Sequence, residues 1–262
     1  MELLGYAASI LIGISLGLIG SGGSILTVPV LVYLFHVDPV LATTYSLCIV
    51  GVSSIAGVIS RLRQKLLDIK IILNFGIPSI LGVFLSRKFI LHAIPTQFTL
   101  FQTITISKSS FIMVFFATLM LASALSMILG KNHTEIEGQK PVYGYSLLFV
   151  GLAEGLITGI VGAGGGFLII PALVLLGKLP MKKAIASSLF IITIKSLVGF
   201  GGDLLHVAVD WKFLLSIVVL ATLGIVTGNY LNKKMDGAKL KKGFGWFVLI
   251  MSIIILVEQF LA

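Results

Sequence analysis

The sequence predicts an all-α membrane protein that crosses the bilayer several times. Of its 262 residues, 57% are hydrophobic and only 11% are charged, and the mean hydropathy is +1.12. Soluble domains carry about 25% charged residues, so a water-soluble fold is excluded. Apolar runs long enough for a helix to cross a bilayer recur along the whole chain. They do not alternate between apolar and polar residues as the strands of a membrane β-barrel would.

The net charge of +9 does not indicate a nucleic-acid-binding protein. Lys and Arg gather between the apolar runs, as they do in cytoplasmic loops of membrane proteins, and no module combines basic with aromatic residues. Cys48 is the only cysteine, which excludes an intramolecular disulfide and a cysteine-based metal cluster. Since no His, Cys, Asp and Glu spacing resembles a metal site either, we expect no cofactor and no metal.

The chain contains two copies of one unit. Residues 13–82 align without a gap with residues 155–224. The matches include residue types that composition alone does not explain, among them Gly20 and Gly162, Gly22 and Gly164, Gly23 and Gly165, Pro29 and Pro171, Ser46 and Ser188, Ser54 and Ser196, Asp68 and Asp210, and Lys70 and Lys212. We infer a duplication, with a first transmembrane repeat at 1–129, a polar linker at 130–142 and a second transmembrane repeat at 143–262.

Both halves divide into the same series of elements. Each begins with an apolar segment, continues through a glycine-rich break into a short helix, and ends with three spans. In the first half these elements are 3–19, 20–24, 25–35, 40–60, 69–86 and 109–129. In the second half they are 143–161, 162–166, 167–177, 182–200, 211–230 and 243–261. The first half also has additional residues near 90–107.

The short helices predict that the halves are inverted repeats. At 1.5 Å per residue neither crosses a bilayer core of about 30 Å, so each should form a re-entrant pair with the segment before it. Three full spans then remain in each half, and an odd number inverts the second half. Most of the 19 Lys and Arg residues fall in segments that this arrangement puts on one side, namely 61–70, 130–142, 178–183 and 233–242. The positive-inside rule therefore predicts that both termini lie outside, although Arg87, Lys88, Lys108 and Lys212 then fall outside too. We expect an inner (plasma) membrane protein.

The two glycine-rich breaks indicate an anion site. A break at membrane depth leaves N–H groups at the start of the next helix, which together carry about half a positive charge. Such a site is tolerated where it lines a cavity, and an anion is its natural partner. Matched breaks in inverted halves mark the binding sites of transporters. We expect both breaks to converge on one anion, lined by Gly20, Ser21, Gly22, Gly23, Ser24, Gly162, Ala163, Gly164, Gly165 and Gly166.

Close packing of helices is the alternative role for a glycine in a membrane helix. We assign this role to Gly13, Gly17, Gly155, Gly159 and the pairs Gly82/Ser86 and Gly224/Gly228. Packing requires one small residue per turn, so the consecutive glycines of the breaks favour the binding role.

Charged residues inside the apolar runs are further candidates. A cation at membrane depth costs at least about 2.5–3.5 kcal/mol, so Lys195 should face a cavity or a partner. We expect it to be the counter-ion of a bound anion; the alternative is an ion pair with Glu154 or Asp203. Glu154, Asp203 and His206 are titratable groups that could couple transport to protons. Their alternative role is interfacial or ion-paired.

Hydroxyl groups follow each break on the next span. Thr43, Thr44, Tyr45 and Ser46 lie in the first half, and Ser187 and Ser188 in the second. Neutral donors suit a sulfonate or sulfite oxygen, which accepts hydrogen bonds without giving any. The alternative is hydrogen bonding between helices or to the helix backbone.

These motifs together resemble the TauE/SafE sulfite exporter family, also called the 4-toluene sulfonate uptake permease family. The resemblance lies in the paired G-x-x-G-x-G-G-G-like segments, the prolines that follow them, and the D-x-K elements at 68–70 and 210–212. It covers essentially the entire chain. It implies a permease that moves sulfite, sulfoacetate, other sulfonates or related organic anions, without fixing the substrate or the direction.

We therefore expect a secondary anion transporter that works by alternating access, with a small anionic substrate and the lipid bilayer as partners. A passive anion channel is the first alternative. The second is an intramembrane hydrolase with Ser21 as nucleophile, but its repeat equivalent is Ala163 and no histidine lies in a helix core to act as base. We expect no enzyme activity. Assembly of several copies is left open.

Overall fold

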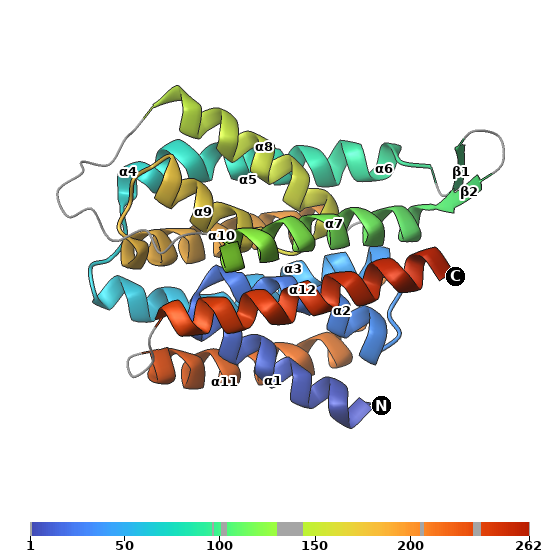
Figure 1. Ribbon diagram of the computed structural model, residues 1–262, viewed down its shortest axis with the longest axis horizontal. Helices are drawn as coiled ribbons and strands as arrows, with labels where there is room; N and C mark the ends of the chain where they lie inside the picture. Colours follow the sequence, from blue (N-terminus) through green and yellow to red (C-terminus); the bar gives the residue numbers. More distant parts are fainter. Residues whose placement is uncertain are drawn as a thin grey trace.

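The computed structural model describes residues 2–95, 97–100, 104–129, 144–204, 207–232 and 237–261. Helices make up nearly all of this part of the chain (Figure 1). Five of them are long and apolar enough to cross a membrane, namely Pro39–Arg63, Ile69–Ile90, Lys108–Ser126, Lys182–Asp203 and Trp211–Leu231. The predicted all-α multi-pass membrane fold is confirmed. The linker predicted at 130–142 and His206 lie outside the described residues.

The first half follows the predicted order of elements. α1 (Glu2–Ile19) ends at Gly20, and a series of short helical turns follows: η1 (Ser21–Leu26), α2 (Thr27–Pro29) and η2 (Val30–Leu34). α3 (Pro39–Arg63) begins where the carboxylate of Asp38 accepts hydrogen bonds from the N–H groups of Val40 and Leu41. This is a standard helix cap, because the first N–H groups of a helix have no acceptor within it.

The next span is longer than predicted. It continues beyond residue 86 to residue 93 through α4 (Ile69–Ile71), η3 (Ile72–Gly76), α5 (Ile77–Leu85), η4 (Ser86–Ile90) and α6 (Leu91–Ala93). The additional residues of the first half then form a small antiparallel hairpin of β1 (Gln97–Leu100) and β2 (Ile104–Ser107). α7 (Lys108–Leu129) completes the half.

The second half has the same order with simpler helices. They are α8 (Tyr145–Val161), α9 (Gly166–Leu175), α10 (Met181–Asp203), α11 (Trp211–Asn232) and α12 (Gly237–Leu261). The sixth predicted span corresponds to α12, whose apolar part, Gly245–Gln259, is shorter than the other spans.

The central helices are α3 and α10, which pack against each other. Of their most apolar stretches 78% and 67% are buried, against 39% for each of the other three spans. Around them, α1 packs against α11, α8 against α5, and α7 against α12. The first helix of each half thus packs against the second full span of the other half, which is the pairing that a two-fold relation between the halves would produce.

The glycines assigned to close packing lie at these helix contacts. A Cβ added at Gly13 or Gly17 of α1 would overlap the backbone of α11 around Ala221, Gly224 and Gly228. In the other pair, a Cβ at Gly155 of α8 would overlap the carbonyl of Ser79 on α5. The close-packing role is confirmed at these positions, because any larger residue would separate the helices.

Equivalent helices of the two halves run in opposite directions (Figure 1). α1 starts at the end of the molecule where both termini lie and runs away from it, whereas α8 runs toward that end. α3 and α10 are opposed in the same way. The β1–β2 hairpin lies at the end with the termini, while the connections from α3 to α4 and from α9 to α10 lie at the opposite end. Opposite directions are a requirement of inverted repeats.

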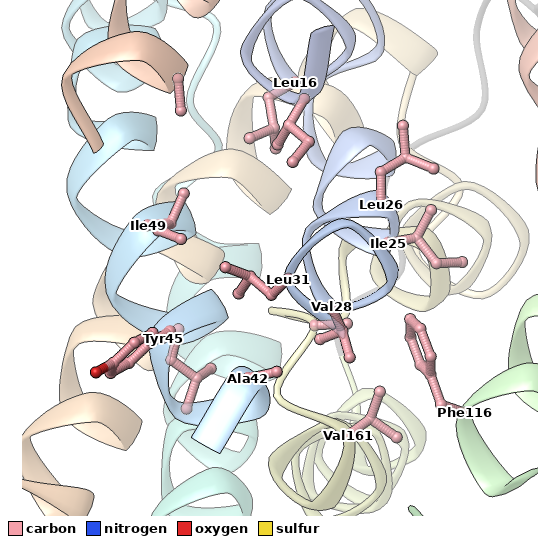
Figure 2. Close-up of a cluster of buried hydrophobic side chains, with 14 of the residues drawn as sticks. Leu16, Ile25, Leu26, Val28, Leu31, Ala42, Tyr45, Ile49, Phe116 and Val161 are labelled. Carbon is pink, nitrogen blue, oxygen red and sulfur yellow. The ribbon is translucent and has the colours of Figure 1, made fainter. Parts of the chain in front are cut away.

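The short helical turns after the first break are embedded in a hydrophobic cluster. Figure 2 shows Ile25, Val28 and Leu31 surrounded by side chains from α1, α3, α7 and α8, including Leu16, Ala42, Tyr45, Phe116 and Val161. Burial of such side chains contributes about 1.5–3 kcal/mol each in water. In a bilayer the same interdigitation acts mainly through van der Waals contact.

Candidate functional site

The two helix breaks meet inside the molecule. At the second break, α8 ends at Gly162, and Gly162, Gly164 and Gly165 have φ angles of 71°, 67° and 72°. Only glycine adopts this left-handed region readily, which explains the residue type at these positions. At the first break Gly20 has a φ angle of 78°. The turn η1 that follows it packs against α9, the helix that begins at the second break.

The first break is more tightly packed than the sequence predicts. A Cβ at Gly20 would meet the side chain of Ile185, and a Cβ at Gly23 would overlap Ser15 and Leu16 of the preceding helix. Ser24 is buried. The chain here continues as the six-residue turn η1 rather than as a regular helix. The positions of Gly22 and Ser21 fall in this turn as well.

Charged and hydroxyl groups gather instead around the second break. A Cβ at Gly162 would lie 2.5 Å from Nη2 of Arg87. A Cβ at Gly164 would lie 3.2 Å from Oγ of Ser196, and one at Gly165 would lie 2.7 Å from Nζ of Lys195. These glycines leave room for the polar groups directly against the backbone. Ala163, between them, is fully buried.

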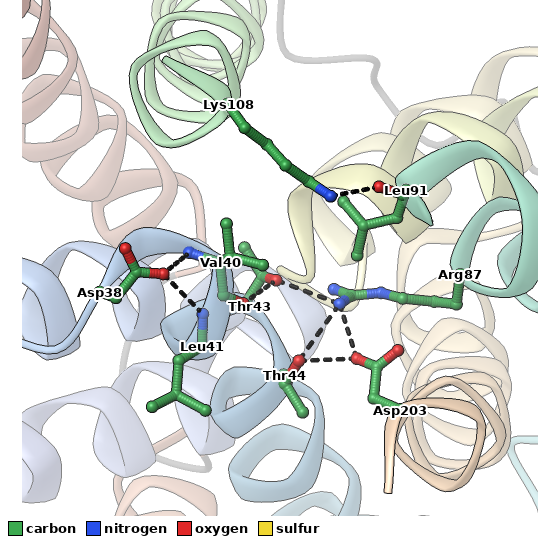
Figure 3. A network of polar contacts seen from close by, with 9 residues as sticks. All are labelled: Asp38, Val40, Leu41, Thr43, Thr44, Arg87, Leu91, Lys108 and Asp203. Atoms are coloured by element: carbon green, nitrogen blue, oxygen red, sulfur yellow. Dashed lines mark hydrogen bonds and ion pairs between the residues drawn. The ribbon is translucent and has the colours of Figure 1, made fainter. Parts of the chain in front are cut away.

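Arg87 forms a buried ion pair with Asp203 (Figure 3). Its Nη1 lies 2.7 Å from Oδ2 of Asp203 and donates hydrogen bonds to Oγ1 of Thr43 and Thr44 at 3.1 and 3.5 Å. Oγ1 of Thr44 donates to the same carboxylate oxygen at 2.7 Å. The network joins η4, α3 and the end of α10, while Nζ of Lys108 donates to the nearby carbonyl of Leu91.

Arg87 lies within the second span of the first half, which was predicted to end at residue 86. The residue is 1% exposed and Asp203 is 2% exposed. The span simply continues past residue 86 into η4, which brings Arg87 into the interior. Asp203 has the ion-paired role that was the alternative to proton coupling.

Lys195 forms the second buried ion pair, with Glu154. Its Nζ lies 2.5 Å from Oε1 of Glu154 and donates to Oγ1 of Thr158 at 3.1 Å. The other carboxylate oxygen, Oε2, accepts from Oγ of Ser79 at 2.6 Å. Lys195 is 0% and Glu154 4% exposed. This is the ion pair with Glu154 that the sequence left open as the alternative for Lys195.

The predicted hydroxyl donors have different surroundings. Thr43 and Thr44 belong to the Arg87 network, whereas the hydroxyl of Tyr45 and Oγ of Ser187 accept hydrogen bonds from the backbone N–H groups of Asp210 and Asp68. Ser188 donates to the carbonyl of Ile185 in its own helix. Ser46 is fully buried, and its Oγ has no hydrogen-bond partner among the described residues.

Four residues of this region were not among the sequence candidates, namely Ser79, Arg87, Thr158 and Ser196. Ser196 is fully buried, and its Oγ likewise lacks a partner within the part of the chain that the structure describes. Because a buried polar group without a partner costs about 1–3 kcal/mol, Ser196 suggests a ligand. The match between Ser54 and Ser196 in the repeat was the available signal for it.

A cavity of about 500 Å³ opens beside Tyr45 between α1, the connection from η2 to α3, the first turns of α3 and the start of α11. Its lining includes Tyr6, Phe35, Asp38, Tyr45, Asp210 and Phe213. Tyr45, which lines this cavity, follows Thr44 of the Arg87 network directly on α3. It is large enough to admit a small organic anion.

The sulfite exporter TauE/SafE family model matches residues 5–255. "Probable membrane transporter protein YunE" of Bacillus subtilis (strain 168) is 29% identical over 240 residues, which are 84% of each chain. A "Probable membrane transporter protein" of Xylella fastidiosa (strain 9a5c) is 27% identical over 252 residues, 94% of this chain and 91% of the relative. "Probable membrane transporter protein MJ0441" of Methanocaldococcus jannaschii is 26% identical over 199 residues, 72% of this chain and 69% of the relative.

No solved structure matches the chain. The family match covers nearly the whole sequence. The relatives align with this chain over most of their own lengths. Together with the five membrane-crossing helices, these matches identify the chain as a multi-pass membrane protein of the sulfite exporter TauE/SafE family.

Proposed function

We propose that this membrane transporter moves small sulfur-containing or organic anions, such as sulfite, sulfoacetate and other sulfonates, and binds them at the second helix break. The observation that carries the proposal is the gathering of Arg87, Lys195 and Ser196 around the glycines of residues 162–166. The family's name supports sulfite as a substrate, and the resemblance of the motifs to that family extends the class to sulfonates and related organic anions.

The electrostatics of this region suit an anion. The N-terminus of a helix of ordinary length attracts negative charge, and α9 has ten residues. Two buried cations lie beside this helix start, each held in the structure by one carboxylate, Arg87 by Asp203 and Lys195 by Glu154. Ser196 supplies a neutral donor to an oxygen that only accepts hydrogen bonds.

The site is therefore centred on one break rather than shared equally by two. By the repeat, the first half has Ser53, Ile12 and Leu16 where the second half has Lys195, Glu154 and Thr158. Ala221 of α11, the helix that packs against α1, is the equivalent of Ser79. None of these is charged, so the first break offers a neutral, close-packed surface. We assign η1 the role of the moving wall against which α9 and the bound anion lie.

Alternating access is the mechanism that best fits the arrangement. The opposed directions of α1 and α8, and of α3 and α10, support inverted repeats, whose rocking exposes a site first on one side and then on the other. The termini lie outside the inner membrane in this scheme. The cavity beside Tyr45 then belongs to the outer side and is the entrance through which the anion reaches the site.

Transport is tested with purified protein in liposomes, using sulfite, sulfoacetate, methanesulfonate and chloride as a panel of anions. We expect saturable uptake of at least one sulfur oxyanion, and acceleration of its exchange when the same anion is present on the opposite side. Flux that neither saturates nor responds to the opposite side would identify a passive channel. Absence of flux for all sulfur anions would contradict the proposed substrate class.

Two serines that are equivalent in the repeat provide a matched pair of variants. Ser196→Ala removes the hydroxyl that faces Gly164, and we expect at least a tenfold loss of apparent affinity, about 1.4 kcal/mol. Ser54→Ala is the control, because Oγ of Ser54 contacts Oγ1 of Thr193 at 2.8 Å and its own helix backbone at 3.0 Å. Equal effects of the two substitutions would remove Ser196 from the site.

A further inference from the structure

We propose that the carboxylate of Glu154 occupies the substrate's own position, and that a substrate anion enters by replacing it when Glu154 takes up a proton. The inference rests on the proposed transport function. It adds to that function the location of the bound anion and the identity of the coupling ion.

The groups around the Glu154 carboxylate are donors that an anion can use, namely one ammonium and two hydroxyls. Oε1 receives the ammonium of Lys195 at 2.5 Å, and the hydroxyl of Thr158, 3.2 Å from Oε1, is shared with the backbone carbonyl of Glu154 at 2.9 Å. Oε2 receives the hydroxyl of Ser79 at 2.6 Å. A sulfonate or sulfite also accepts hydrogen bonds at several oxygens and donates few or none, so the same ammonium and hydroxyls fit it.

The carboxylate lies directly against the second break. A Cβ at Gly165 would overlap Oε1 of Glu154, so the left-handed glycine provides the space in which that oxygen lies. Gly165 is the residue before α9 and caps its start. An anion drawn to the start of α9 therefore meets the Glu154 carboxylate in the same space, and the two cannot be bound together.

The charge balance specifies how the exchange proceeds. With Glu154 ionised, its charge and that of Lys195 cancel. Adding a monovalent anion would leave one uncompensated negative charge away from water, which is costly. A proton taken from water by the Glu154 carboxylate restores neutrality, since Lys195 then pairs with the substrate. On release of the anion, Glu154 gives up this proton and returns to Lys195, so one proton accompanies each monovalent anion.

The other titratable groups near Glu154 are accounted for. α8, which carries Glu154, packs against η3, α5, η4, α7 and α9, and Lys195 of α10 pairs with Glu154 itself. In η3, α5 and α9 no residue is titratable. On η4, Arg87 is paired with Asp203 of α10, and Lys88 is exposed. Of the remaining α10 residues, Lys195 faces Glu154, while Lys182 and Lys183 lie at the start of that helix. Lys108, on α7, bonds to Leu91.

Proton uptake on binding is the direct test. Methanesulfonate is the probe, because its own charge does not change near neutral pH. Titration calorimetry of the wild-type protein in two buffers of different ionisation enthalpy measures the protons bound with each anion. We expect one proton per methanesulfonate, and an affinity that falls about tenfold per pH unit once Glu154 is ionised before binding.

Glu154→Gln should abolish this dependence. A glutamine imitates the protonated carboxyl group, so we expect methanesulfonate affinity that is independent of pH and at least equal to that of the wild type in acid. Ser54→Ala is the matched control, since it removes a buried hydroxyl of the other half and leaves both buried ion pairs in place. We expect this variant to keep the wild-type pH slope, whatever its absolute affinity.

The outcomes separate this inference from the transport function. Wild-type binding without proton uptake would overturn the role of Glu154 alone, and this result does not depend on whether Glu154→Gln folds. A folded Glu154→Gln protein that retained the pH slope would overturn it too. If the wild type bound neither methanesulfonate nor sulfite at any pH, the proposed function itself would fail.

Discussion

The hydroxyl of Tyr45 accepts a hydrogen bond from the backbone N–H of Asp210 at 2.8 Å. The repeat reproduces this contact, because Oγ of Ser187, the equivalent of Tyr45, accepts from the N–H of Asp68 at 3.1 Å. Each aspartate carboxylate in turn accepts the N–H group three residues later, at Phe213 and Ile71. Tyr45 and Ser187 thus tie the central helices α3 and α10 to the starts of α11 and α4.

We expect Ser187→Ala to weaken the fold rather than transport. The N–H of Asp68 would lose its acceptor, which costs about 1 kcal/mol for a typical hydrogen bond. Thermal unfolding in detergent should therefore begin at a lower temperature, while liposome uptake of the preferred anion keeps its apparent affinity. A loss of affinity at an unchanged unfolding temperature would return Ser187 to the substrate site predicted from the sequence.

The Arg87–Asp203 pair predicts strongly non-additive substitutions. Removal of one partner leaves an uncompensated buried charge, which typically costs 3–5 kcal/mol, about the range expected for Asp203→Asn alone. The double variant Arg87→Met with Asp203→Asn should recover a large part of this loss, because both charges are then removed. The measurement is thermal or denaturant unfolding of the four proteins of the cycle. Additive losses would show that the pair does not couple the two residues energetically.

Gly165 should tolerate no side chain, in contrast to Gly201. Alanine at residue 165 would adopt an unfavourable φ angle of 72°, a strain of order 1–3 kcal/mol, and would overlap the Glu154 carboxylate. We expect Gly165→Ala to lose transport and much of the folded protein in gel filtration. Gly201→Ala is the control, since a Cβ there meets no atom within 4 Å and alanine favours a helix by about 1 kcal/mol. Comparable behaviour of the two variants would contradict the assigned role of the break.

Much of the fold could be predicted because its determinants are local or repeated. Apolar runs define the spans, and the four glycines within 162–166 lower the helix propensity sharply at one place in the chain. Because of the repeat, each matched element could be predicted twice, once from each half of the sequence. The hairpin of β1 and β2 was not predictable in this way, because the residues near 90–107 have no counterpart in the second half.

The charged site was less predictable because its partners are far apart in the sequence. Lys195 and Glu154 are 41 residues apart, and Arg87 and Asp203 are 116 apart. The repeat also suggested that both breaks would contribute equally. Yet Ile12 stands where the second half has Glu154, and Ser53 where it has Lys195, so this asymmetry was already visible in the sequence.

The predicted orientation is tested by labelling single cysteines in intact cells. The background is Cys48→Ala, which removes the chain's only natural cysteine, a buried one. A cysteine at Leu3 should react with a membrane-impermeant maleimide from outside, because the termini lie at the outer end of the proposed topology. Cysteines at Lys65 and Lys178 should react only after the membrane is opened, because the connections that carry them lie at the opposite end (Figure 1). Both lysines belong to the segments that the positive-inside rule puts in the cytoplasm. The reverse labelling pattern would show that the termini face the cytoplasm. The cavity beside Tyr45 would then receive the anion from the cytoplasmic side.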